Sequence, residues 1–121
     1  MPQILLIDDD DSLRKTLRIT LQRLGHVVAE ARDGDEAIRL HEKTAFDVVL
    51  TDLIMPNKEG IETIITLRRQ RPDVKIIAMS GGGRLNAKDI LAVAKAMGAH
   101  QVLAKPFSHE ALVAALAAVT S

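Results

Sequence analysis

The 121-residue chain contains no cysteine and only two aromatic residues, Phe46 and Phe107. The absence of cysteine excludes disulfides and thiolate metal sites, and it is compatible with a reducing compartment. Two aromatic side chains are too few to form a platform on which nucleic-acid bases stack. We therefore expect no direct contact with nucleic acid.

An excess of charge and a long apolar segment are lacking as well. Lys plus Arg and Asp plus Glu number 16 each, so no net charge attracts the protein to nucleic acid or to an anionic membrane. No apolar run approaches the roughly 20 residues of a membrane-spanning helix, and the N-terminus lacks a signal-peptide pattern. We expect a cytoplasmic protein without membrane contact, built as one domain over residues 1–121.

Short apolar segments alternate with segments of helical periodicity along the chain. The apolar segments are too short for helices and predict five strands. These are Gln3–Ile7, Val27–Ala31, Val48–Leu50, Lys75–Met79 and Gln101–Ala104. A helix is predicted after each strand. The helices run from Ser12 to Gly25, from Asp35 to Lys43, from Ile61 to a point before Pro72, from Asn86 to Met97, and through Leu112, Leu116 and Val119 to the chain end.

Five strand–helix pairs whose strands are apolar throughout predict a parallel sheet covered by helices on both faces. Right-handed crossovers leave few topologies, and the open doubly wound sheet is the commonest at this length. We therefore predict the α/β class, with a doubly wound five-stranded parallel sheet in the flavodoxin-like order 2-1-3-4-5.

Polar residues stand at the carboxyl ends of four predicted strands. They are Asp8 and Asp9 after the first strand, Asp52 after the third, Ser80 after the fourth and Lys105 after the fifth. Ligands of such sheets bind beyond these strand ends, so we expect the five residues to converge at one edge. If Lys105 lies on the far side of the molecule from Asp52, the expectation is wrong.

Carboxylates gathered in this way repel one another unless a cation neutralises them. Mg²⁺ prefers oxygen ligands and is usually held by one or two carboxylates together with a phosphate oxygen. One carboxylate is then available as a nucleophile that forms an acyl phosphate. Lys105 and Ser80 supply an ammonium and a hydroxyl for the phosphoryl oxygens. The pattern predicts phosphoryl transfer to an aspartate beside Mg²⁺.

Four motifs in a fixed order carry a resemblance to a known family. They are Leu5-Leu6-Ile7-Asp8-Asp9-Asp10, Asp52-Leu53-Ile54-Met55-Pro56 with Gly60, Met79-Ser80-Gly81, and Lys105-Pro106-Phe107. From Gln3 to Thr120 the chain resembles the receiver domain of two-component response regulators. The resemblance implies that Asp52 accepts a phosphoryl group from the phosphohistidine of a sensor histidine kinase.

The resemblance also implies the metal ligands and the conformational switch. Mg²⁺ would be bound by the carboxylates of Asp9 and Asp52 and by the backbone carbonyl of Ile54, while Asp8 acts largely through water. A cis Lys105–Pro106 bond is implied. On phosphorylation Ser80 would move toward the phosphoryl group, and the fourth helix, fifth strand and fifth helix would repack.

Three further expectations concern activity and partners. The protein would be a phosphoacceptor rather than an enzyme, although it assists its own phosphorylation and dephosphorylation. Its partners would be the sensor histidine kinase and a downstream protein target or phosphotransfer protein. We expect a monomer or weak dimer, which either acts alone or is a piece of a longer polypeptide.

The sequence departs from the usual receiver pattern at the switch position. Val102 stands three residues before Lys105, where receiver domains commonly carry Tyr or Phe, which argues against an aromatic switch of the usual kind. By the resemblance, Ile54 and Gly82 occupy the family positions that influence access of the hydrolytic water. Neither is an acid or base, so steric shielding would determine the phosphoryl lifetime. Candidate output residues, equally consistent with a solvated face, are Arg84, Lys88, Lys95, His100 and Gln101.

Two other functions remain open. Asp8-Asp9-Asp10 contains an Asp-x-Asp pattern, as in aspartyl-phosphate hydrolases of the haloacid dehalogenase type, whose nucleophile would be Asp8. A receiver-like scaffold that binds partners without phosphorylation is the third possibility, and the complete set of acids, hydroxyl and lysine argues against it. Histidines without metal-ligand spacing are predicted to be exposed. These are His26, His41, His100 and His109.

Overall fold

A single five-stranded parallel sheet forms the centre of the molecule. The computed structural model describes residues 2–53, 59–80, 92 and 95–120. The strands are β1 (Gln3–Ile7), β2 (Val27–Ala31), β3 (Val48–Asp52), β4 (Lys75–Ser80) and β5 (Gln101–Ala104). Their order is β2-β1-β3-β4-β5, and every neighbouring pair is parallel. The predicted fold class and strand order are confirmed.

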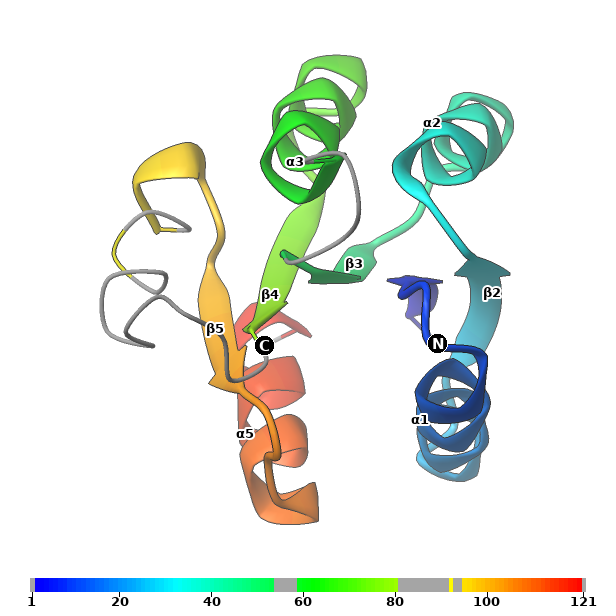
Figure 1. The fold of residues 1–121 in the computed structure, drawn as a ribbon, viewed down its shortest axis with the longest axis vertical. Helices are drawn as coiled ribbons and strands as arrows, with labels where there is room; N and C mark the ends of the chain where they lie inside the picture. The colour runs from blue at the N-terminus through cyan, green and yellow to red at the C-terminus, as the bar shows by residue number, and fades with distance from the viewer. Residues whose placement is uncertain (1, 54–58, 81–91, 93–94, 121) are drawn as a thin grey trace.

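Helices cover both faces of the sheet. They are α1 (Asp11–Arg23), α2 (Gly34–Lys43), α3 (Glu59–Gln70) and α5 (His109–Thr120). Figure 1 shows α1 and α5 on one face and α2 and α3 on the other. Most of the helix predicted from Asn86 to Met97 lies outside the described residues. Within the part of the chain that is described, no helix has the length and apolarity needed to cross a bilayer.

The central strands contribute side chains to two separate cores. Leu5 and Val49 pack in the core beneath α2 and α3, whereas Ile4 and Leu50 pack in the core beneath α1 and α5. Successive residues of a strand point to opposite faces, and both faces are covered here. A strand buried on both faces has no polar side, which explains the continuous apolar runs in the sequence.

Aspartates cap the N-termini of two of the helices. The Asp10 carboxylate accepts a hydrogen bond from the backbone N–H of Leu13 at 3.1 Å and thereby caps α1. Asp33 caps α2 in the same way, through the N–H of Glu36 at 2.8 Å. These caps satisfy donors that the first helical turn leaves unpaired. They fix the chain direction as it leaves β1 and β2.

The prediction that all four histidines are exposed is wrong for His41. Its side chain is fully buried, and its ring stacks on Phe46 with centroids 5.9 Å apart. His41 follows buried Ala37 by four residues, so helical periodicity places both on the inner face of α2. His109 is exposed, whereas His26 and His100 are half-buried.

His100 extends the pairing between β4 and β5. Its backbone N–H donates to the carbonyl of Ile76 at 2.7 Å, and its ring Nδ1 accepts a hydrogen bond from the Ile76 N–H at 3.1 Å. Nδ1 has a free lone pair only in the neutral imidazole. Burial, and then the positive charges of Lys75 and Arg68, lower the pKa of His100.

We predict that the free energy of unfolding falls as the pH is lowered from 7 to 5. The unfolded chain binds protons at His100 from about pH 6.5 downward, whereas the folded chain does so only at lower pH. Burial and the charge of Arg71 lower the pKa of His41, which adds to the loss. His100→Asn keeps an acceptor and removes the titration, so urea unfolding should show a smaller loss. His109→Asn is the exposed control, and equal losses in both variants would contradict the prediction.

Candidate functional site

Three carboxylates meet at the carboxyl ends of β1 and β3. Oxygen atoms of Asp8, Asp9 and Asp52 lie within 4.8 Å of one another. Asp8 is fully buried and Asp52 is 6% exposed, whereas Asp9 faces solvent. The register between β1 and β3 pairs Ile7 with Thr51, so the next residue of each strand, Asp8 and Asp52, arrives at the same level. Buried carboxylates require a compensating charge or hydrogen bonds.

Lys105 provides that compensation from the end of β5. Its Nζ donates to Asp8 Oδ2 at 2.9 Å and to Asp52 Oδ2 at 3.0 Å. Burial lowers the pKa of Lys105, but the hydrogen bonds and charges of the two carboxylates outweigh this effect and raise it overall. The expectation that Lys105 and Asp52 converge is therefore confirmed. The Lys105–Pro106 bond is cis, as expected.

The charges of this cluster do not cancel. The carboxylates of Asp8, Asp9 and Asp52 carry three negative charges and the Lys105 ammonium carries one positive charge, which leaves two negative charges. A divalent cation would neutralise that remainder. The donors are all carboxylate oxygens, the type that Mg²⁺ prefers, and the exposed Asp9 opens the cluster to solvent. The residues present therefore fit Mg²⁺.

Ser80 ends β4 beside these residues. Its backbone carbonyl accepts a hydrogen bond from the Lys105 N–H at 2.7 Å, so the ends of β4 and β5 are joined. The side chain is 2% exposed, and its Oγ has no hydrogen-bond partner among the described residues. A buried hydroxyl without a partner is costly, and it gains stability when an acceptor arrives.

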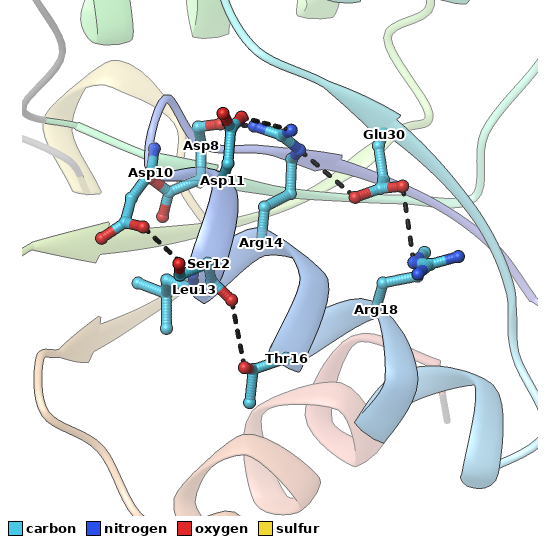
Figure 2. A network of polar contacts seen from close by, with 9 residues as sticks. All are labelled: Asp8, Asp10, Asp11, Ser12, Leu13, Arg14, Thr16, Arg18 and Glu30. Carbon is cyan, nitrogen blue, oxygen red and sulfur yellow. Dashed lines mark hydrogen bonds and ion pairs between the residues drawn. The ribbon is translucent and has the colours of Figure 1, made fainter.

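Arg14 completes the polar surroundings of Asp8 and was missed by the sequence reasoning. Its Nη1 donates to the Asp8 backbone carbonyl at 2.7 Å (Figure 2). The signal was the spacing, because Arg14 follows the N-cap residue Asp10 by four positions. Helical side chains point toward the helix N-terminus, so an arginine one turn into α1 reaches back to the strand end.

The remaining predicted residues lie apart from the carboxylates or outside the described part. Val102 pairs with Ala78 across β4 and β5, and its half-buried side chain packs against the core beneath α2 and α3. Lys95 is exposed and Gln101 is half-buried. The expected carbonyl ligand of Ile54 and the predicted residues Gly82, Arg84 and Lys88 lie outside the described residues.

Residues 4–117 match the family model described as the response regulator receiver domain. The chain belongs to this family. Three longer proteins are similar to this chain.

The chain is 34% identical over 119 residues to the transcriptional regulatory protein CpxR of Escherichia coli. It is 37% identical over 111 residues to the DNA-binding transcriptional regulator NtrC of Azospirillum brasilense. It is 32% identical over 116 residues to the CAI-1 autoinducer sensor kinase/phosphatase CqsS of Vibrio cholerae.

These alignments cover most of the receiver domain and only part of each relative. The alignment with CpxR covers 98% of this chain and 49% of CpxR. The alignment with NtrC covers 91% of this chain and 22% of NtrC, and that with CqsS covers 96% of this chain and 17% of CqsS. The chain therefore spans half or less of the length of these relatives.

Solved structures agree with the fold of the receiver domain. The chemotaxis protein CheY4 of Vibrio cholerae has a TM-score of 0.85 and 34% identity, with 98% of each chain covered. A response regulator from Burkholderia pseudomallei has a TM-score of 0.84 and 31% identity, covering 96% of this chain and 66% of that one. The latter structure holds a phosphorylated aspartic acid, a calcium ion and citrate. The family match favours the receiver over the haloacid dehalogenase alternative.

Replacement of Lys105 tests the electrostatics of the site. Lys105→Met leaves Asp8 and Asp52 without the ammonium between them, so we expect a loss of about 3 kcal/mol in the free energy of unfolding. Urea denaturation at pH 7 with a chelator measures this loss. Asp52→Asn in the Lys105→Met background should recover part of it, because one of the repelling charges is removed.

Arg18→Met is the matched control for the loss of an ion pair. Arg18 contacts Glu30 at 3.4 Å, and both side chains are one-third exposed, so its replacement should lower stability by less than about 1 kcal/mol. Equal losses in Lys105→Met and Arg18→Met would show that the Lys105 contacts carry no special weight.

Proposed function

We propose that this receiver domain accepts a phosphoryl group on Asp52 from a sensor histidine kinase, and that phosphorylation changes its protein-binding surface. The observation that carries this proposal is the ammonium of Lys105, which contacts Asp52 and Asp8 beside the third carboxylate, Asp9. Membership of the receiver family and the phosphorylated aspartic acid of the Burkholderia pseudomallei relative support it.

Asp52 fits the nucleophile better than Asp8 does. Asp8 follows β1 and has no exposed surface. Asp52 retains a small exposed surface at the end of the central strand β3. A carboxylate oxygen of Asp52 attacks phosphorus, an O–P bond forms as the N–P bond of phosphohistidine breaks, and the imidazole nitrogen leaves with the electron pair.

The remaining residues of the cluster position the reacting groups. Asp9 and Asp52 would hold Mg²⁺ through their carboxylates, with Asp8 acting largely through water, and the ion would neutralise charge on the phosphoryl oxygens. Lys105 is placed to donate to a phosphoryl oxygen once Asp52 becomes an acyl phosphate. Ser80 would donate its hydroxyl to another oxygen.

The contact of Ser80 with the phosphoryl group links the chemistry to the switch. Its buried Oγ lacks a partner among the described residues, so an acceptor on Asp52 stabilises the conformation in which the two meet. We infer that the fourth helix, β5 and α5 repack around it, with the half-buried Val102 in place of an aromatic residue. A downstream protein or phosphotransfer protein would bind the repacked surface.

Several finer assignments belong to the same proposal. The protein is a phosphoacceptor that assists its own phosphorylation and dephosphorylation, with a phosphoryl lifetime determined by steric shielding at Ile54 and Gly82. It acts in the cytoplasm as a monomer or weak dimer. The longer relatives include two transcriptional regulators and a sensor kinase, so receiver domains similar to this one occur in proteins of different kinds.

Incubation with acetyl phosphate and Mg²⁺ tests the acceptor. Intact mass spectrometry should show the gain of one phosphoryl group by the native chain and by Asp10→Asn, since asparagine caps a helix as well as aspartate does. Asp52→Asn should show no gain. An adduct on Asp52→Asn, or turnover of acetyl phosphate that disappears with Asp8→Asn but persists with Asp52→Asn, would contradict the proposal. A native chain that gains no mass would instead support the unphosphorylated scaffold.

Ser80→Ala tests whether the Ser80 hydroxyl contributes to phosphorylation or only to the stability of the fold. Removal of a buried hydroxyl without a described partner should leave the free energy of unfolding unchanged or raise it slightly. Phosphorylation by acetyl phosphate should slow at least several-fold, because one donor to the phosphoryl oxygens is lost. Urea unfolding and the rate of mass gain measure the two effects. A large loss of stability with an unchanged rate would assign Ser80 to packing alone.

A further inference from the structure

The side chain of Arg14 contacts three separate segments at once. Nη1 donates to the Asp8 carbonyl at 2.7 Å, Nη2 to Asp11 Oδ1 at 2.6 Å, and Nε to Glu30 Oε1 at 3.2 Å (Figure 2). The side chain is only 12% exposed. Each of the three guanidinium nitrogens therefore has an acceptor, and together they join the end of β1, the start of α1 and the edge strand β2.

Every polar group of Asp8, in the backbone and in the side chain, forms a hydrogen bond. Its N–H donates to the Ala31 carbonyl at 3.2 Å, its Oδ1 accepts from the Asp10 N–H at 2.9 Å, and its Oδ2 accepts from Lys105. Arg14 holds the remaining group, the backbone carbonyl. That carbonyl belongs to the same planar peptide unit as the N–H of Asp9, so the direction of the carbonyl determines the orientation of the Asp9 backbone N–H.

Asp9 depends on this peptide for its position. Its side chain is exposed. Its carboxylate accepts no hydrogen bond from a described residue and forms no ion pair with one. The peptide on one side is fixed by Arg14, and the residue on the other side, Asp10, is tied to Asp8 Oδ1. The backbone therefore fixes the direction in which the Asp9 side chain leaves the chain, and from there its carboxylate lies within 4.8 Å of those of Asp8 and Asp52.

Glu30 anchors Arg14 on the side away from the carboxylates. It accepts from Arg14 Nε and lies 3.4 Å from Arg18 Nε, so two arginines share it. Among the described residues, Arg18 contacts Glu30 but not Asp8, whereas Arg14 contacts both (Figure 2). The chain thus offers two arginines that share one anchor and differ in their contact with the site.

We propose that Arg14 is a positioning residue that orients the Asp8–Asp9 peptide so that the Asp9 carboxylate binds Mg²⁺. This inference rests on the proposed function, because it requires that the acidic cluster bind the ion. Partners that orient metal ligands typically contribute a factor of 10 to 100 in metal affinity. Arg14 would contribute through the backbone of a ligand instead of through its side chain.

Isothermal titration of the full chain with Mg²⁺ alone tests the inference. Arg14→Met keeps the aliphatic stem and removes the donors, so we expect the dissociation constant to rise about tenfold. Arg18→Met should stay within about twofold of the native chain, because it loses the Glu30 ion pair without touching Asp8. Binding by the native chain with an unchanged constant in Arg14→Met, or an equal rise in both variants, would overturn the inference and leave the proposed function standing.

Absence of Mg²⁺ binding by the native chain would instead overturn the proposed function and the inference together. With acetyl phosphate, Arg14→Met should need more Mg²⁺ for half-maximal phosphorylation and reach nearly the native rate at saturation. A merely structural role would lower the saturated rate as well. In Mg²⁺-free protein, the amide resonance of Asp9 should shift in Arg14→Met and stay in place in Arg18→Met.

Glu30→Gln provides a second variant if Arg14→Met does not fold. It leaves Arg14 present but removes the charge that anchors the guanidinium. The Mg²⁺ dissociation constant should rise, by less than in Arg14→Met, because the amide oxygen still accepts a hydrogen bond. A constant equal to that of the native chain would overturn the inference.

Discussion

The double contact of one ammonium with two buried carboxylates is the interaction on which the site depends. Lys105 joins the end of β5 to the ends of β1 and β3, although these residues are 97 and 53 positions apart in the chain. Removing either partner would leave a buried charge without compensation. With Asp9 added, the cluster keeps two negative charges, which matches a divalent cation and explains why acids and a lysine occur together here.

The polar groups around this contact fall into two sets. On the β1 side they are hydrogen-bonded to the protein, and on the β4 side a hydroxyl has no partner among the described residues. Asp8 is held by the Ala31 carbonyl, the Asp10 N–H, Lys105 and Arg14, so the β1 side of the site is fixed. Ser80 lies on the β4 side with a buried hydroxyl that no described residue pairs. In the proposed mechanism a phosphoryl group on Asp52 would find the carboxylates of Asp8 and Asp9 in place and would give the Ser80 hydroxyl a new partner, which is the differential contact that a population shift requires.

The sequence alone predicted the sheet and the cluster because both follow from local pattern and topology. Strands buried on both faces are apolar throughout, and a parallel sheet gathers its carboxyl ends at one edge, which brought Asp52 and Lys105 together. The burial of His41 was missed because an isolated histidine does not show which face of α2 meets the sheet. Arg14 was missed because one of its contacts is with Glu30 on β2, and a contact between segments that are distant in the sequence leaves little signal there.

A crystal structure of the chain with Mg²⁺ and beryllofluoride, which stands in for the phosphoryl group, tests the central claim most directly. The account predicts beryllofluoride bonded to Asp52, Mg²⁺ held by carboxylates that include Asp9, and Lys105 Nζ within hydrogen-bond distance of a fluorine atom. Beryllofluoride on Asp8, or a Lys105 side chain directed away from the bound group, would contradict it.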